Sequence, residues 1–249
     1  MIEISETSLA GIACLHATPA GMQHKALPVV AFWHGFTSSK EVYAYFAVAL
    51  AQRGFRVVMP DALHHGARYN GDSETRLTQF WEILSSNIDE VACIRQALEK
   101  QGLIADGRFA VGGASQGGMT ALGAMARYPD IRSVACLMGS GYFSTLAKQL
   151  FPPFVAHSAE AQAHLDTRLA PLAEWDVTHH LAALAERPLL IWHGDADEVV
   201  PVAESVRLVD ALRAQGYDQH LTTIIETHVG HRVTPAALQA TVAFFASSL

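Results

Sequence analysis

A serine flanked by glycines is the most informative chemical feature of the chain. The segment Gly113-Ala114-Ser115-Gln116-Gly117 is its only G-x-S-x-G pattern. A serine hydroxyl is a weak nucleophile at neutral pH, so it needs exposure on a tight turn, a base that removes its proton, and donors for the oxyanion that it creates. The glycines allow the backbone to crowd against such a turn. Because an apolar strand is predicted at Phe109–Gly112 and a helix after the serine, the pattern predicts a nucleophile elbow with Ser115 at its tip.

An acid that could orient a histidine follows a later apolar strand, predicted at Leu189–Trp192. Asp197 lies in the turn after this strand, at the carboxyl end where open α/β sheets place their chemistry. Along the chain, an elbow serine is followed first by Asp or Glu and then by His, and this order is met. We predict that Asp197 holds the imidazole tautomer and stabilises its charged form. Asp195 is the alternative, but it directly follows Gly194, where a short carboxylate more often caps a turn.

The chain has thirteen histidines, so the base has to be chosen by position rather than by residue type. It should come after the last predicted strand, Leu221–Ile225. His228 and His231 both meet this condition, ahead of a final helix that Thr234 and Pro235 should open. We predict His231 as the general base, with His228 as the alternative.

Several other histidines lie in turns and are expected to have structural roles. His34 and His193 each precede a glycine at the end of a predicted strand, and His64 and His65 follow another strand. We expect all four to be hydrogen-bonded structural histidines. The adjacent pairs 64/65 and 179/180 lack the i, i+4 spacing with which two histidines on one helix face bind a metal. The sequence therefore predicts no metal site, and acyl transfer by a serine requires no other cofactor.

Two backbone N–H groups are predicted to form the oxyanion hole. One belongs to Gln116, the residue immediately after the nucleophile, and the other should come from the loop after the strand that ends at His34-Gly35. Phe36 is the natural donor in that loop, because Gly35 leaves the backbone free to turn the amide inward. The Phe36 side chain can also form a wall of the substrate pocket.

The elements that must position these residues alternate between apolar strands and amphipathic helical stretches. This alternation predicts an α/β fold with a mostly parallel, twisted central sheet covered by helices on both faces. The expected strands are Leu27–Trp33, Phe55–Met59, Phe109–Gly112, Val134–Met138, Leu189–Trp192 and Leu221–Ile225. Helices are expected at residues 40–53, with Val42, Ala49, Phe46 and Leu50 in an apolar stripe, and at residues 73–101, with Leu77, Phe80, Trp81, Leu84 and Ile88 among its core positions.

Residues 142–187 separate two predicted strands by far more chain than an ordinary loop needs. We expect a small helical cap inserted into a single domain that spans residues 1–249. Tyr142, Phe143 and Trp175 are its tentative contributions to the substrate pocket, since such apolar groups could shield a site from water. The alternative is an ordinary packed crossover.

Charge and composition exclude several classes of partner. The net charge is −7 and the pI is near 6.0, without a basic stripe, so neither nucleic acid nor an anionic membrane is an expected partner. The one long uncharged run, residues 109–126, contains the elbow and five glycines, so no membrane span is expected. The cysteines Cys14, Cys93 and Cys136 are scattered, and the acidic start does not resemble a signal peptide. We therefore expect a cytoplasmic protein that acts on a small molecule.

Taken together, these motifs resemble the α/β-hydrolase superfamily, in the branch of the dienelactone hydrolases and prolyl-oligopeptidase-type catalytic domains. The resemblance covers nearly the whole chain and rests on residues 34–36, 60–66, 113–117, 193–201 and 230–231. The segments 34–39, 112–115, 138–143 and 173–175 are similar to those of small bacterial carboxylesterases. The resemblance implies a cytoplasmic esterase without a cofactor, acting on short acyl esters. It also implies Ser115, Asp197 and His231 as its triad.

The chain departs from that branch in two places. Dienelactone hydrolases have a cysteine at the nucleophile position, so their substrate is not carried over to Ser115. The family's Asp-x-x-Gly-His-Gly motif is changed to Asp61-Ala62-Leu63-His64-His65-Gly66. We expect a serine carboxylesterase for short-chain acyl esters. A thioesterase, lactonase or small peptidase would use the same residues, and a non-catalytic binding protein is the alternative from another class.

Overall fold

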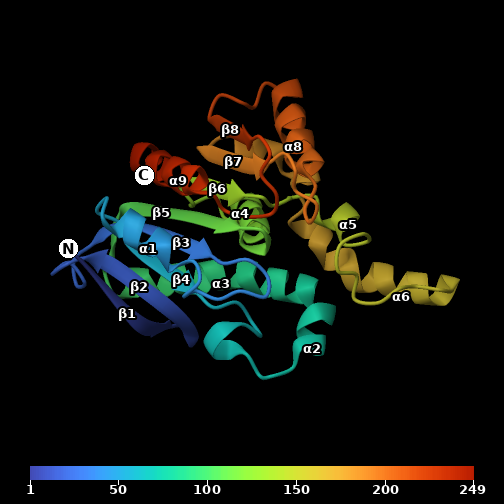
Figure 1. Ribbon diagram of the computed structural model, residues 1–249, viewed down its shortest axis with the longest axis horizontal. Helices are drawn as coiled ribbons and strands as arrows, with labels where there is room; N and C mark the ends of the chain where they lie inside the picture. Colours follow the sequence, from blue (N-terminus) through green and yellow to red (C-terminus); the bar gives the residue numbers. More distant parts are fainter.

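An eight-stranded sheet forms the centre of the computed structural model, which describes residues 1–249 (Figure 1). The strands lie in the order β1-β2-β4-β3-β5-β6-β7-β8. Pairs β1–β2 and β2–β4 are antiparallel and all the others are parallel, so the predicted mostly parallel α/β sheet is confirmed. The strand bounds are β1 Ile2–Leu9, β2 Ile12–Pro19, β3 Leu27–Trp33, β4 Arg56–Pro60, β5 Ile104–Ala114, β6 Val134–Leu137, β7 Leu189–Gly194 and β8 Leu221–Glu226.

Helices cover both faces of this sheet. The α-helices are α1 Ala44–Ala51, α2 Ser73–Thr78, α3 Phe80–Lys100, α4 Gln116–Arg127, α5 Phe143–Leu146, α6 Ala159–Leu169, α7 Leu181–Ala185, α8 Val202–Ala214 and α9 Pro235–Ser248. Apolar residues of α3, α4, α7 and α8 pack with Val29 and Ala31 of β3 on one face. Residues of α1 and α9 pack with Val30 and Phe32 on the other face. Successive residues of β3 therefore enter different cores, which explains why this strand is apolar without alternation.

The predicted helices differ from the observed ones at their ends. The stretch at 73–101 is two helices, α2 and α3, which meet at Gln79. The helix expected at 40–53 is shorter, and Val42 lies before it and is 62% exposed, so its place in an apolar stripe was wrong. Leu77 is also exposed rather than part of the core. At the last helix, the Thr234 hydroxyl caps α9 by accepting the Ala237 N–H at 3.0 Å, as Thr234-Pro235 predicts.

The segment between β6 and β7 is helical and lies beside the start of α3. It contains α5, α6 and α7 and the 3₁₀ turns η2 Ala170–Glu174 and η3 Val177–His179, and α6 projects from the body of the molecule (Figure 1). A third core cluster joins the segment to α3, with Phe80, Trp81 and Leu84 packed against Phe143 and other apolar residues of the segment. None of the helices is both long enough and apolar enough to cross a membrane.

Candidate active site

Ser115 occupies a sharp turn between the end of β5 and the start of α4. Its φ is 57° and its ψ is −120°, a region that a residue with a side chain rarely adopts. The Ser115 N–H donates to Leu137 O of the neighbouring strand at 2.9 Å. A Cβ added to Gly117 would lie 2.1 Å from Trp33 O, and one added to Gly113 would lie 2.3 Å from the Gly117 backbone. The two glycines are therefore required by the close approach of strand and helix, as the elbow pattern predicts.

Three side chains from distant parts of the chain form one row of hydrogen bonds. His231 Nε2 lies 2.8 Å from Ser115 Oγ, and His231 Nδ1 lies 2.7 Å from Asp197 Oδ2. A carboxylate only accepts, so Nδ1 carries the proton of the neutral ring and Nε2 is free to accept from the serine hydroxyl. The structure thus brings together the three residues that the sequence singled out, in the arrangement that activates a serine.

The Asp197 carboxylate is buried and receives donors on both oxygens. The N–H groups of Val199 and Val200 donate to Oδ1 at 2.9 and 3.0 Å, and His193 Nε2 lies 3.2 Å from Oδ2. Burial alone would raise the pKa of Asp197, but hydrogen bonds from His193, His231 and the backbone hold this pKa well below its ordinary value. The carboxylate is therefore ionised near neutral pH, as a group that stabilises an imidazolium must be.

His193 is a contact of the candidate acid that the sequence did not reveal. Its Nε2 donates to the carbonyl of Val200 at 2.9 Å and lies 3.2 Å from Asp197, while its Nδ1 accepts from the Ser205 hydroxyl at 2.7 Å. The only signal in the sequence is the spacing of four residues between His193 and Asp197. That spacing indicates a contact only if the turn between His193 and Asp197 folds back on itself, which the sequence does not show.

The two alternative residues are tied to each other instead of to Ser115. Asp195 is exposed and accepts the backbone N–H of His228 at 2.6 Å, so it reaches the loop after β8 instead of capping its own turn as expected. His228 is also exposed, with φ 60°. The geometry therefore favours Asp197 over Asp195 and His231 over His228.

Two backbone N–H groups next to Ser115 are available to an oxyanion. The Gln116 N–H opens α4 directly after the nucleophile, and the Phe36 N–H lies in the loop after β3. Neither donates in any turn or loop hydrogen bond of the chain. The buried Gln116 side chain is engaged elsewhere, since its Nε2 donates to Phe80 O at 3.0 Å. Both N–H groups are therefore free to donate a hydrogen bond to an oxyanion.

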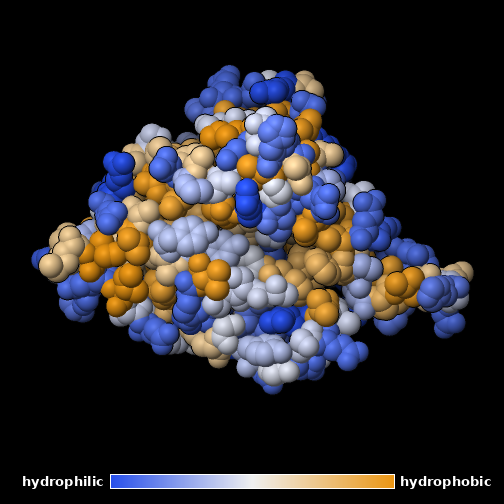
Figure 2. Space-filling view, in the orientation of Figure 1, coloured by the Kyte–Doolittle hydropathy of each residue, from blue (hydrophilic) through white to orange (hydrophobic).

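A mainly apolar cavity of about 270 Å³ opens beside Ser115 and His231. The rings of Phe36, Phe80 and Phe151 lie against one another on its wall, with centroid distances of 4.9 to 5.4 Å. In Figure 2, hydrophobic surface gathers where the segment with α5 and α6 meets the body of the molecule. The remaining lining residues are Thr37, Leu77, Met119, Leu150, Val199 and Val200.

The structure brings Phe36 to this cavity but not the other three residues expected there. Tyr142 is buried beneath the Arg207 guanidinium, which lies 3.6 Å from its ring centroid. Phe143 is fully buried in the third core cluster, and Trp175 lies against Arg127 at 4.2 Å. These aromatics anchor their segment, and it is Leu150 and Phe151 that reach the site. The pocket prediction is therefore corrected at Tyr142, Phe143 and Trp175.

No group of three or more His, Cys, Asp or Glu side chains has a geometry that would hold a metal ion. The histidines near the site have other partners. His34 and His65 contact backbone groups of the loops after β3 and β4, and His64 Nε2 lies 3.1 Å from Gln79 Oε1.

The fold and the site define a class of protein. Similar solved structures include TT1662 from Thermus thermophilus, with a TM-score of 0.77, 24% identity and 100% of both chains covered. A putative dienelactone hydrolase from Klebsiella pneumoniae has a TM-score of 0.67 at 17% identity and 99% coverage of both chains. At these identities the likeness shows the fold alone, which is that of the α/β hydrolases.

The chain belongs to the prolyl oligopeptidase family, whose model matches residues 42–249. It is 52% identical over 249 residues to esterase YjfP of Escherichia coli (strain K12), with both chains covered completely. It is 35% identical over 255 residues to putative esterase YitV of Bacillus subtilis (strain 168), again over the full length of both. The predicted family resemblance is confirmed, and the chain is an enzyme of the serine hydrolase class.

Proposed function

We propose that this enzyme is a carboxylesterase in which Ser115, His231 and Asp197 act as the catalytic triad. The observation that carries the proposal is the pair of contacts made by His231, 2.8 Å to Ser115 Oγ and 2.7 Å to Asp197 Oδ2. Ester hydrolysis is supported by the names of two full-length relatives, both described as esterases.

In this mechanism His231 Nε2 takes the Ser115 proton while Oγ attacks the ester carbonyl carbon. The N–H groups of Phe36 and Gln116 stabilise the tetrahedral oxyanion. His231 then gives its proton to the leaving alcohol, and an acyl-enzyme remains. Water, deprotonated by His231, attacks the acyl-enzyme by the same route and releases the acid, while Asp197 holds the ring and stabilises its charged form throughout.

The cavity supports a preference for short acyl chains. Its wall beside Ser115 is formed by Phe36, Phe80 and Phe151, and its volume of about 270 Å³ favours a small apolar acyl group. Residues 142–187 act in this account as a cap on a single domain, because Leu150 and Phe151 of that segment line the cavity and shield it from water.

Hydrolysis of p-nitrophenyl esters from acetate to dodecanoate by wild type and Ser115→Ala tests this function. We expect turnover that peaks at short chains and that the substitution abolishes. Serine-dependent turnover that peaks at long chains would contradict the chain-length preference alone. Turnover unchanged in Ser115→Ala would contradict the triad.

A small peptidase is the second candidate, and the family match favours it. The same residues would cleave an amide, because the triad specifies acyl transfer rather than the leaving group. Against it, both full-length relatives are named as esterases. Aminoacyl p-nitroanilides distinguish the two: turnover of these amides faster than of the matching esters would favour the peptidase.

A further inference from the structure

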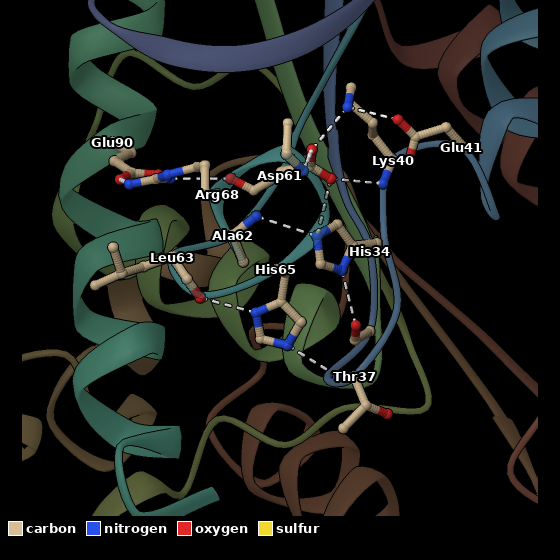
Figure 3. Close-up of polar contacts among 12 residues, drawn as sticks. His34, Thr37, Lys40, Glu41, Asp61, Ala62, Leu63, His65, Arg68 and Glu90 are labelled. Atoms are coloured by element: carbon tan, nitrogen blue, oxygen red, sulfur yellow. Dashed lines mark hydrogen bonds and ion pairs between the residues drawn. The ribbon is translucent and has the colours of Figure 1, made fainter. Parts of the chain in front are cut away.

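A second buried polar cluster lies behind the loop that carries Phe36 (Figure 3). It is built on Asp61, His34 and His65, all fully buried, and on Lys40, which is almost fully buried. None of these side chains takes part in the row of hydrogen bonds from Ser115 to Asp197. Two of them, His34 and His65, bond directly to residues 35–37, the loop that supplies one of the proposed oxyanion donors.

His34 holds the peptide group that precedes Phe36. Its Nδ1 donates to Gly35 O at 2.7 Å, and the Ser38 N–H donates to the same oxygen at 3.2 Å. In a trans peptide the N–H of the next residue points away from the carbonyl, so these bonds to Gly35 O fix the direction of the Phe36 N–H. Gly35 lies against the nucleophile, since a Cβ placed on it would be 3.4 Å from Ser115 Cβ.

His65 holds the peptide group that follows Phe36. Its Nε2 accepts the Thr37 N–H at 2.9 Å, and its Nδ1 donates to Leu63 O at 2.8 Å. Thr37 has a φ of 63°, which is unfavourable for a β-branched residue and persists only where the surroundings hold it. Phe36 is thus held between two anchored peptide groups, one on each side.

Both rings must be neutral to make these bonds. A backbone N–H can only donate and a carbonyl can only accept, so each ring needs one protonated and one bare nitrogen. In His34 the bare nitrogen is Nε2, which accepts the Ala62 N–H at 3.1 Å. Burial lowers the pKa of both histidines, that of His65 to about 4, against the weaker opposing effect of Asp61. The other charged or titratable groups that act on His65 are His34 and Arg76.

Asp61 ties the two loops together. Its carboxylate accepts from Lys40 N at 3.0 Å, from Lys40 Nζ at 2.7 Å and from Ala67 N at 2.9 Å. The chain between His65 and Ala67 passes so close that a Cβ on Gly66 would lie 2.1 Å from Asp61 Oδ1. The position of His65 relative to Thr37 is therefore set by buried contacts rather than by a free loop.

We propose that His65, together with His34, is a positioning residue that aims the Phe36 N–H at the oxyanion formed on attack by Ser115. This rests on the proposed function, because the oxyanion is that of the proposed reaction. If His65 had only a structural role, its replacement would lower stability. If it is a positioning residue, its replacement lowers turnover while substrate binding is kept.

The test compares His65→Leu, which removes the acceptor, with His65→Gln, whose amide oxygen can still accept from Thr37. His64→Asn is the matched control, because His64 contacts Gln79 rather than the Phe36 loop and asparagine tolerates its φ of 60°. Loss of one oxyanion donor typically lowers kcat by about 10²- to 10³-fold. We expect His65→Leu to lower kcat by about 100-fold with KM changed less than about 3-fold, and His65→Gln to recover about 10-fold of that loss.

Hydrogen exchange of the Thr37 amide gives a readout that does not depend on catalysis. We expect it to accelerate in His65→Leu and to remain slow in His65→Gln and His64→Asn. The proposal is overturned if His65→Leu keeps the kcat of His64→Asn, or if Thr37 exchange is unchanged in it. If wild type itself lacked turnover that depends on Ser115, the proposed function would be wrong, and the contact between His65 and Thr37 would have no role in catalysis. The exchange data would still show whether His65 holds the loop.

Discussion

At the scale of single residues, the site depends on groups whose hydrogen bonds allow one protonation state only. Asp197 receives donors on both carboxylate oxygens and must be ionised, whereas His65 faces one donor and one acceptor and must be neutral. Each group is buried, so a proton gained or lost would leave an unpaired polar atom away from water. The protonation states follow from the surrounding backbone rather than from the residue types.

The first prediction concerns Asp197. Replacing it by asparagine keeps the size of the side chain but removes the charge that stabilises His231. The amide oxygen would accept from the Val199 and Val200 N–H groups, so the NH2 group would face His231 Nδ1 and favour the wrong tautomer. We expect kcat on a p-nitrophenyl ester to fall by about 10⁴-fold. Asp195→Asn is the control, and since the Asp195 side chain hydrogen-bonds to the His228 N–H and not to His231, we expect a change of less than about 3-fold. Equal losses in the two variants would contradict the assignment of the acid.

The second prediction concerns stability in weak acid. In the unfolded chain His65 takes up a proton near pH 6.5, but in the folded chain only near its lowered pKa of about 4. Between these values the unfolded state binds more protons, so the free energy of unfolding falls as the pH falls. The glutamine side chain of His65→Gln does not titrate. Between pH 7 and pH 5.5, the free energy of unfolding of this variant should therefore fall by about 1 kcal/mol less than that of wild type.

Urea unfolding at the two pH values measures this difference. His16 and His34 also have pKa values lowered by burial and act in the same direction, so the comparison with wild type is needed to isolate His65. Asp197 does not interfere, because the stability from its lowered pKa is lost only below its ordinary value of 3.8. Identical pH dependence in wild type and His65→Gln would show that His65 is not held neutral.

At the scale of elements, the elbow positions Ser115, whereas the segment at residues 142–187 supplies part of the cavity wall. The elbow needs a strand and a helix that approach closely enough for Ser115 to be forced into its strained turn. The segment needs an anchor, provided by Phe143 in the third core cluster, so that Leu150 and Phe151 can line the cavity. In both elements, residues that never touch the substrate determine where the reacting or lining groups lie.

The third prediction compares two glycines of α4. Gly117→Ala places a methyl group 2.1 Å from Trp33 O, a backbone atom that cannot move aside, and we expect a loss of about 3 kcal/mol in the free energy of unfolding. Gly123→Ala meets the end of the Ile88 side chain at 2.4 Å, which can rotate. Since alanine also favours the helix, we expect that variant to stay within about 1 kcal/mol of wild type. Chemical denaturation checks both, and equal losses would contradict the account of the elbow.

The fourth prediction concerns chain length. Phe151→Ala removes a ring that packs on Phe36 and Phe80, so the cavity beside Ser115 becomes longer. We expect the ratio of kcat/KM for octanoate to that for acetate to rise about 10-fold. Phe154→Ala is the matched control, because Phe154 belongs to the same segment but packs on His164. An unchanged ratio in Phe151→Ala would show that another wall limits the acyl chain.

At the scale of the whole molecule, the sheet brings together residues that are distant in the chain, such as Ser115 and His231, which are 116 residues apart. The carboxyl ends of β5 and β7 and the loop after β8 supply the serine, the acid and the histidine, while the loop after β3 carries Phe36. Because these strands are parallel, the loops after their carboxyl ends lie at the same edge of the sheet. Residues that are far apart in the chain therefore lie together in the site.

The same topology explains what the sequence could predict. The inner parallel strands β3, β4, β6 and β7 are almost entirely buried and are visible as apolar runs, whereas β1 is an exposed edge strand, and neither it nor its partner β2 was predicted. Ser115, Asp197 and His231 could be selected because strand ends and chain order constrain them. The aromatic residues of the segment 142–187 could not be assigned correctly, since residue type does not show whether Tyr142 or Phe143 faces a cavity or a core. The contacts of His193 and His65 depend on how the turns fold back.

Ser115 is the proposed nucleophile, and covalent labelling of its hydroxyl is the most direct test of that role. Wild type, Ser115→Ala and Asp195→Asn are treated with a fluorophosphonate, and the adduct is measured by intact mass and located by peptide mapping. The account predicts one adduct per chain on Ser115 in wild type and Asp195→Asn, and none in Ser115→Ala. An adduct on another residue, or equal labelling of a folded Ser115→Ala, would contradict it.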